Sequence, residues 1–237
     1  MNRLTLDFTS TVRHNQLIHD LVRKHLTLAS AFLGINSLNA TTFDFAPLSE
    51  SSVIEVELKT NGSFALAGIK GNFSNIGGQI EFFPVNLSLS SGEVLLDARS
   101  LRFGYHRTNT DAQKKNWLNS KEHPKISFKL KRLDNILWKE RSAFAQAHGS
   151  LSFKKAKLEF SLPLEIRYFR AERKKYDGKR GDLITIKGHK TLNLGDLDMM
   201  EGALLGEISN DVSVKISLIG ASNRIRPLLP TRLLASP

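Results

Sequence analysis

Apolar and polar residues alternate along many short stretches of this chain from Phe43 onward. In the segment 54–59, Ile54, Val56 and Leu58 are separated by charged residues. The same alternation returns in three later segments, 126–131, 157–166 and 212–218. A period of two is typical of a strand with one buried face and one solvated face. The pattern therefore predicts an antiparallel β protein built from many strands.

Turn-forming pairs separate these stretches and predict a series of hairpins. The pairs are Asn61-Gly62, Gly77-Gly78, Ser91-Gly92, Asp177-Gly178 and Asn210-Asp211. The longest interruption is Thr110–Ser120, which is polar but ends near Trp117 and Leu118. We expect one short helix there, packed on the outside or across one mouth of the sheet.

The number of strands and their single apolar faces limit the fold class. A closed, eight-stranded antiparallel β-barrel over residues 43–220 turns every apolar face inward and leaves no unpaired edge. A two-sheet sandwich is the alternative. We therefore predict an all-β barrel domain with one short helix, which can hold one ligand in its interior.

The first forty residues have a different composition from the barrel segment. An apolar stretch, Leu26–Leu38, follows the basic triplet Arg23-Lys24-His25 and precedes Asn39-Ala40, which is the order of a secretory signal. We expect residues 1–40 to be a signal peptide or leader, and the mature protein to be periplasmic or secreted. Apolar residues at helical spacing within 15–34 leave an uncleaved, membrane-surface helix as the alternative.

The segment after the last predicted strand, 221–237, is rich in Pro and Arg and shows no periodicity. We expect a flexible tail there. The chain has no run of about 18 uncharged apolar residues, so the sequence does not predict a membrane-spanning helix.

The chain of 237 residues contains 34 Lys and Arg against 23 Asp and Glu, a formal net charge of +11. Such a surplus attracts anionic lipid surfaces or nucleic acid. The excess lies mainly between Lys114 and Lys190, and the segment 167–180 is its densest part. A solvated basic hairpin loop explains the same run without a partner. Basic residues next to Tyr168 and Phe169 also suit single-stranded bases, but a secretory signal argues against nucleic acid as the partner.

The residues that usually carry catalysis are missing or scattered. The chain has no cysteine, which excludes disulfides and thiolate chemistry, and its seven histidines show no metal-ligand spacing. No Gly-x-Ser-x-Gly elbow, phosphate loop or dinucleotide fingerprint occurs. Carboxylates such as Glu55 and Glu159 fall on the predicted solvent face of strands, where acid–base chemistry has no cleft. The sequence therefore predicts a protein without enzymatic activity and without a metal.

The order of several short segments resembles the YceI-like family, periplasmic lipid-binding proteins with a lipocalin-like barrel. The matching segments are Ser51-Ser52-Val53, Gly71-Asn72-Phe73, the stretch 78–82, the stretch 95–101, the Pro-x-Ile-x-Phe step at 124–128, the stretch 149–153, Leu162-Pro163-Leu164 and the stretch 209–214. Thr110-Asp111 stands where the family has Arg-Asp, and Lys154 stands where it has glycine, so the chain resembles a divergent member.

The resemblance implies non-catalytic binding or transport of a long apolar chain, such as a polyisoprenoid or a quinone-like lipid, along the barrel axis. The candidate lining residues of this tunnel are Ile54, Val56, Phe64, Phe73, Ile80, Phe82, Val94, Leu96, Phe128, Phe153, Phe160, Leu162, Val214 and Ile216. The candidate head-group or membrane contacts are Arg167, Arg170, Arg173, Lys174 and Lys175. Two other functions stay open: a solidly packed structural or stress-related barrel, and a basic nucleic-acid-binding barrel.

Overall fold

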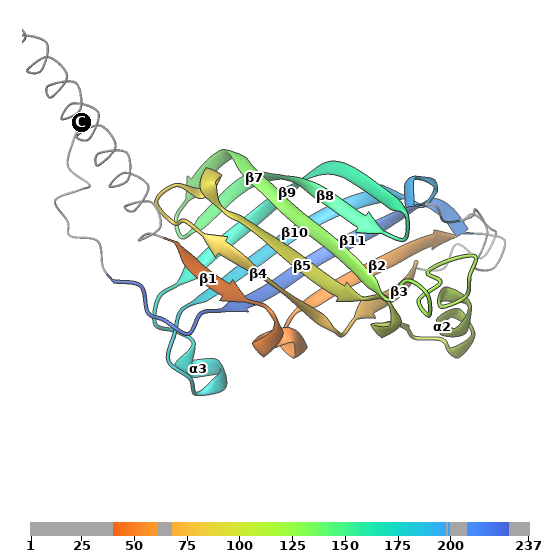
Figure 1. Ribbon diagram of the computed structural model, residues 1–237, viewed down its shortest axis with the longest axis horizontal. Coiled ribbons are helices and arrows are strands. Elements are labelled where there is room, and N and C mark those ends of the chain that lie inside the picture. Colours follow the sequence, from red (N-terminus) through yellow and green to blue (C-terminus); the bar gives the residue numbers. More distant parts are fainter. Residues whose placement is uncertain (1–39, 61–67, 198, 200–207, 228–237) are drawn as a thin grey trace, which may run out of the picture. The chain divides into compact units, whose positions relative to one another are not determined.

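The computed structural model describes residues 40–60, 68–197, 199 and 208–227 (Figure 1). All strands in this part of the chain belong to one antiparallel sheet. The strands are β1 (Thr41–Asp44), β2 (Val53–Thr60), β3 (Ile69–Phe73), β4 (Ile76–Phe82), β5 (Ser91–Asp97), β6 (Leu101–Phe103), β7 (Lys125–Lys139), β8 (Ser142–Phe153), β9 (Ala156–Phe169), β10 (Leu183–Asn193) and β11 (Ile208–Ala221).

The sheet closes into an eight-stranded barrel, as predicted. Three of the eight strand positions are shared by two consecutive strands, β1 with β2, β3 with β4, and β5 with β6. β11 pairs with β10 along one edge and with β2 and then β1 along the other, where Asp44 lies opposite Ala221. The strand pairs form a closed ring, which rules out the sandwich.

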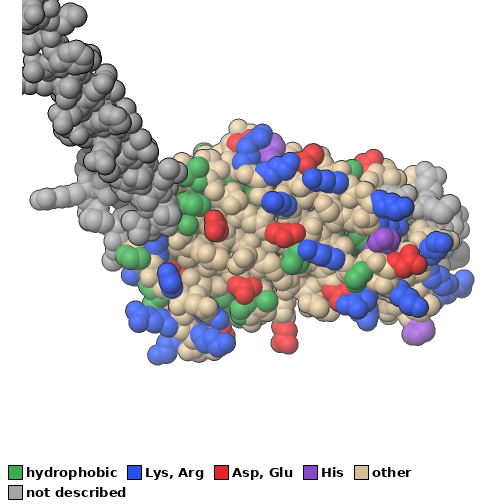
Figure 2. Space-filling model, viewed as in Figure 1, with side chains coloured by type: hydrophobic (Ala, Val, Ile, Leu, Met, Phe, Trp, Pro, Cys, Tyr) green, Lys and Arg blue, Asp and Glu red, His purple; other side chains and the backbone are tan. Residues whose placement is uncertain are grey.

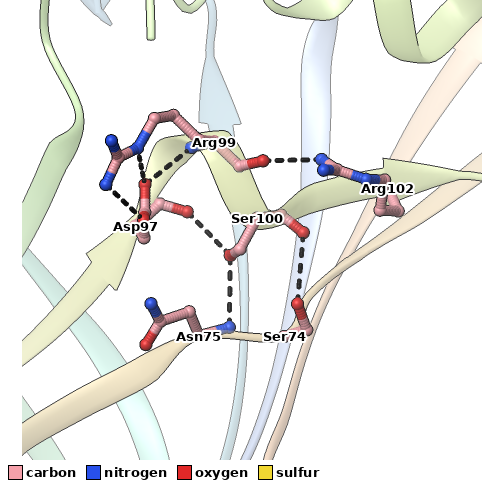
Figure 3. Close-up of polar contacts among 6 residues, drawn as sticks. All are labelled: Ser74, Asn75, Asp97, Arg99, Ser100 and Arg102. Atoms are coloured by element: carbon pink, nitrogen blue, oxygen red, sulfur yellow. Dashed lines mark hydrogen bonds and ion pairs between the residues drawn. The ribbon is translucent and has the colours of Figure 1, made fainter. Parts of the chain in front are cut away.

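Two of the interrupted strands bend side by side, held by hydrogen bonds (Figure 3). The backbone N–H and the guanidinium of Arg99 donate to Asp97, at 2.8–2.9 Å. The Ser100 hydroxyl donates to the Asp97 carbonyl at 2.7 Å and accepts from the Asn75 N–H at 3.2 Å. The hydrogen bond from Arg99 holds the pKa of Asp97 below its ordinary value. The β3–β4 and β5–β6 bends are thereby tied together.

Three of the predicted turns are wrong, because their glycine and polar pairs lie inside strands. Gly77-Gly78 and Ser91-Gly92 belong to the β4–β5 ladder, in which Gly78 pairs with Val94 and Ile80 with Gly92. Gly78 has φ +97°, a conformation that favours glycine within a strand as well as in a turn. Asn210-Asp211 lies within β11, where the pairing with β2 shifts register. Asp177-Gly178 does lie in the connection between two strands, where it ends a single helical turn. Asn61-Gly62 lies outside the described residues.

The helix predicted for Thr110–Ser120 begins and ends earlier in the chain. α2 spans His106–Ala112, and the residues after it form turns. Trp117 and Leu118 follow the helix and are buried against the barrel core. A second helix of four residues, α3 (Lys174–Asp177), lies between β9 and β10. Short 3-10 turns are η1 (Ala46–Ser51), η2 (Leu87–Leu89), η3 (Ala98–Ser100) and η4 (Gly195–Leu197).

Antiparallel connections place the loops at two opposite ends of the barrel (Figure 1). We call them the α3 end and the α2 end. The α3 end carries the start of β1, the loop 83–90, the hairpin tip 140–141, the loop 170–182 and the end of β11. The α2 end carries the segment 104–124, the hairpin tip 154–155 and η4.

Part of the predicted flexible tail packs on the loop 170–182. The backbone N–H of Arg226 donates to Asp182 at 2.8 Å, and the Arg226 carbonyl accepts from the Arg170 guanidinium at 2.8 Å. Gly181 allows this approach, because a Cβ there would lie 1.8 Å from the Ser222 carbonyl oxygen. The rest of the predicted tail, 228–237, lies outside the described residues.

Candidate functional site: an apolar barrel interior

The barrel encloses an apolar cavity of about 130 Å³. Each of the eight strand positions contributes at least one side chain to its wall, for example Ile54 from β2, Ile80 from β4 and Leu151 from β8. Inward-facing side chains of successive strands meet here because the alternation points every second residue at the barrel axis. A cavity with apolar walls holds an apolar group by the hydrophobic effect.

A second apolar cavity of about 120 Å³ lies toward the α2 end. Its wall includes Trp117 and Leu118, which follow α2, and Leu197 of η4. The two cavities share six wall residues: Ile54, Leu96, Ile126, Leu151, Leu192 and Val214. They are therefore neighbouring chambers of one barrel interior.

Twelve of the fourteen predicted lining residues lie on the walls of these chambers. They are Ile54, Val56, Phe73, Ile80, Val94, Leu96, Phe128, Phe153, Phe160, Leu162, Val214 and Ile216. Phe64 lies outside the described residues. Contact of these side chains with a ligand stays a prediction, because side chains that line the cavities also pack in the hydrophobic core.

Phe82 was predicted to line the tunnel, but it is buried in an aromatic cluster at the α3 end. Its ring stacks on Tyr168 and meets Phe43 edge-on, each at a centroid distance of 6.1 Å. Phe82 is 1% exposed and lines neither cavity. Alternation identifies an inward side chain but does not show whether neighbouring rings fill the space. Tyr168 of this cluster also donates a hydrogen bond to Asp182 of the loop 170–182.

Arg173 was predicted to contact a head group or membrane, and its burial contradicts this. Only 2% of its side chain is exposed. Its guanidinium binds the Asp177 carboxylate at 2.8 Å, the Ser222 carbonyl at 3.1 Å and Asn223 Oδ1 at 2.6 Å. Arg173 therefore holds the loop 170–182 to the C-terminal segment. Its partners come from a part of the chain that the basic run itself does not indicate.

The other four basic candidates are exposed at the α3 end and line neither cavity. Arg167 binds Glu165 at 2.8 Å and the Ser142 hydroxyl at 2.8 Å on the outer barrel surface. Arg170 contacts the C-terminal segment, and Lys174 and Lys175 lie on α3. Their geometry suits contact with an external surface and not with a ligand inside the barrel.

Lys190, which was not among the predicted site residues, is a charged residue on the wall of the larger cavity. Its ammonium lies 5.8 Å from the centre of the Phe160 ring. The signal was present in the alternation of β10, because Lys190 occupies the same phase as Ile184, Ile186 and Leu192. A charged residue on the apolar phase of a strand is a candidate for ligand contact.

In the part of the chain that the structure describes, no three His, Asp or Glu side chains lie close enough together to hold a metal ion. Among the described helices, none has both the length and the apolar character needed to cross a membrane.

A family model for the YceI-like domain matches residues 23–219 of this chain. The chain belongs to the YceI-like domain family. The segments on which the sequence resemblance rested also build the cavities. Ile126 and Phe128 of the Pro-x-Ile-x-Phe step and Leu162 line the larger cavity, and Val212 lines the smaller one.

Solved structures share the YceI-like fold with this chain at low sequence identity. Burkholderia cenocepacia BcnA is 16% identical over 72% of this chain and 97% of that chain, with a TM-score of 0.58. The Campylobacter jejuni YCEI protein is 17% identical over 69% and 90%, with a TM-score of 0.55. A polyisoprenoid binding domain from Saccharophagus degradans is 11% identical over 77% and 99%, with a TM-score of 0.56. A search of curated proteins found no match.

Proposed function

We propose that this YceI-like barrel binds the apolar chain of one lipid, of isoprenoid type, and carries it without chemical change. The observation that carries the proposal is the pair of adjoining apolar cavities, which share six wall residues along the barrel interior. Family membership and the structural likeness to a polyisoprenoid binding domain support the same ligand class. The scattered histidines and carboxylates of the sequence favour a carrier over an enzyme.

Burial of the chain in these cavities is the source of affinity. Each CH₂ group transferred from water to an apolar wall contributes about 0.8 kcal/mol, so about ten methylenes correspond to about 8 kcal/mol before the cost of ordering the chain. Side chains shared by the two chambers have to rotate to let one ligand pass through both. A packed barrel without ligand and a nucleic-acid-binding barrel are the competing functions.

Native mass spectrometry of the protein purified from its own host tests the proposal, followed by extraction and lipid analysis. We expect one prenyl-chain lipid per barrel. Protein that carries no lipid and also fails to bind added geranylgeraniol would favour the packed barrel. Steeply salt-dependent binding of single-stranded DNA without lipid binding would favour the nucleic-acid function.

Two neighbouring positions on β10 supply a matched pair of variants. Leu192 lines both cavities, whereas Thr191 points outward and is exposed. We expect Leu192→Trp to fill the passage and abolish prenyl-chain binding, and Thr191→Trp to leave binding unchanged. Equal binding by both variants would contradict a ligand inside the barrel.

We further propose that the α3 end contacts an anionic membrane surface. Six of the eight exposed large apolar side chains of the described residues lie there: Val85, Leu89, Leu137, Trp138, Phe144 and Tyr176. Exposed basic residues share this end: Lys139, Arg141, Arg170, Lys174, Lys175, Lys179 and Arg180. Figure 2 shows green apolar and blue basic side chains around the α3 end. Apolar tips beside basic residues suit the interface of a membrane with anionic lipid.

Co-sedimentation with vesicles of phosphatidylcholine, with and without phosphatidylglycerol, tests this contact. We expect binding only with phosphatidylglycerol. Reversal of Lys174 and Lys175 to Glu should weaken it more than tenfold, at about 1 kcal/mol for each charge. The matched control reverses Lys155 and Lys157, which are exposed at the α2 end. Equal loss in both variants would show a non-specific charge effect and contradict a docking surface at the α3 end.

We also propose that the chain is exported and that the leader is removed, because the order of Arg23-Lys24-His25 and Leu26–Leu38 is that of a secretory signal. The mass of the protein isolated from its host tests this. A mature chain that begins near Thr41 is the expected result, and a chain that keeps residues 15–34 would favour the membrane-surface helix.

A further inference from the structure

Backbone pairing between β9 and β10 stops partway along the two strands, and we call the unpaired stretch the β9–β10 gap. The ladder joining these strands runs from the Leu183–Phe169 pair to the Gly188–Leu164 pair and then ends, although both strands are described over their full lengths. Beyond Gly188, residues 189–193 of β10 continue to pair with β11 only. Five residues of strand correspond to about 16 Å. η4 lies against β9 at the far end of this stretch, so the gap is bounded at both ends.

Lys190 lies in this gap and faces the cavity. Along β10, residues at even positions from Ile184 to Leu192 face the barrel interior, and Lys190 belongs to this set. Its ammonium lies 5.8 Å from the centre of the Phe160 ring, which belongs to the facing strand β9. Phe160 in turn contacts Phe128 at a ring distance of 5.2 Å inside the cavity. Lys190 is thus half-buried, with its ammonium beside an aromatic ring of the cavity wall.

Within the described residues, the Lys190 ammonium makes no ion pair and no hydrogen bond with another side chain. An ammonium that is partly removed from water loses solvation, and contact with an aromatic ring returns only part of that loss. An anion at the gap would compensate for the lost solvation of the ammonium, because an ammonium–phosphate or ammonium–carboxylate contact is a charge-assisted hydrogen bond.

We propose that Lys190 binds the anionic head group, a phosphate or a carboxylate, of a lipid whose apolar chain enters the cavity through the β9–β10 gap. This inference rests on the proposed function, and it narrows the ligand from apolar lipids in general to single-chain amphiphiles with an anionic head. The head group lies at the gap in contact with water, and the chain lies among the inward side chains. The basic residues of the α3 end take no part in ligand binding.

Competition against the neutral fluorophore N-phenyl-1-naphthylamine tests the proposal with two ligands of equal chain length, geranylgeranyl phosphate and geranylgeraniol. We expect the wild-type protein to bind the phosphate at least about tenfold more tightly, the range of a hydrogen bond to a charged group. Lys190→Met should remove this preference and leave geranylgeraniol binding unchanged. Lys190→Arg should keep the preference.

Lys187→Met is the matched control, because Lys187 lies on the same strand but points outward and is exposed. It removes the same charge and should keep the preference for the phosphate. A wild-type protein that binds both ligands equally, or a Lys190→Met variant that keeps the preference, would overturn the role of Lys190 and leave the proposed function intact. Binding of neither ligand would overturn both. If Lys190→Met does not fold, Lys190→Gln serves in its place.

Discussion

Tyr168 donates a hydrogen bond of 2.6 Å from its hydroxyl to the carboxylate of Asp182, at the boundary between the aromatic cluster and the α3-end loop. Asp182 is fully buried and also accepts hydrogen bonds from the backbone N–H groups of Ala171 and Arg226. One carboxylate thus joins the end of β9, the loop 170–182 and the C-terminal segment. Burial, reinforced by the Asp182 hydrogen bond, raises the pKa of Tyr168 above its ordinary value.

We expect Tyr168→Phe to lower the free energy of unfolding by about 1.5–3 kcal/mol at pH 7, because a hydrogen bond to a buried charge is lost. Because the pKa of Tyr168 is higher in the folded state, this group stabilises the folded protein fully at pH values below its unfolded pKa of 10.0. The stabilisation is lost as the pH rises above that value. The difference between wild type and variant should therefore be constant up to about pH 9 and decrease above pH 10. Urea unfolding at several pH values measures it. A difference that grows with alkaline pH would contradict the assigned hydrogen bond.

The stability contributed by the Arg173–Asp177 ion pair should depend on pH in the opposite direction to that of the Tyr168–Asp182 hydrogen bond. The hydrogen bond from Arg173 lowers the pKa of Asp177 below its ordinary value of 3.8. Because the pKa of Asp177 is lower in the folded state, this group stabilises the folded protein at pH values above its unfolded pKa. The stabilisation is lost as the pH falls through the folded-state pKa. We expect Asp177→Asn to be less stable than wild type at pH 7, with the difference closing below pH 3.8. Urea unfolding of both proteins at pH 7 and pH 3 tests this, and Glu172→Gln on the same loop is the control.

The alternation of apolar and polar residues predicted the barrel correctly, because a period of two shows which face of each strand is buried. It also identified twelve wall residues, since wall and core positions share that phase. It could not distinguish Phe82 from them, because the aromatic cluster depends on Phe43 and Tyr168, which come from distant strands.

Contacts between segments far apart in the sequence explain the other differences. The partners of Arg173 include Ser222 and Asn223, about fifty residues later, so the basic run gave no sign of its burial. The gap beside Lys190 exists because the β9–β10 ladder ends at the Gly188–Leu164 pair, and no local sequence pattern indicates that end. Glycine pairs predicted turns because glycine tolerates positive φ, but Gly78 uses that freedom inside a strand.

Phe82 and Val94 separate core packing from cavity lining. Phe82 is buried among rings, whereas Val94 is partly buried and lines the larger cavity. We expect Phe82→Ala to lower the free energy of unfolding by about 3–5 kcal/mol, because it leaves a void in a packed cluster. Val94→Ala should cost about 1–2 kcal/mol, and a bound prenyl chain should lose affinity in this variant. Similar unfolding energies for the two variants would contradict the division between cluster and cavity.

Gly78 and its neighbour Gly77 provide the sharpest test of the strand assignment in β4. Gly78 has φ +97°, and a Cβ there would lie 2.1 Å from the Glu93 carbonyl oxygen of β5, whereas a Cβ on Gly77 would meet nothing within 4 Å. We expect Gly78→Ala to lower the free energy of unfolding by about 2 kcal/mol or more, since backbone strain and a clash with the paired strand add together. Gly77→Ala should change it by about 0.5 kcal/mol or less, or stabilise the fold slightly by restricting the unfolded chain. Were the pair an exposed turn, as its sequence suggests, neither substitution would meet β5. Equal effects in urea unfolding would therefore contradict the β4–β5 register, and a large difference would confirm that Gly78 lets these two barrel strands approach.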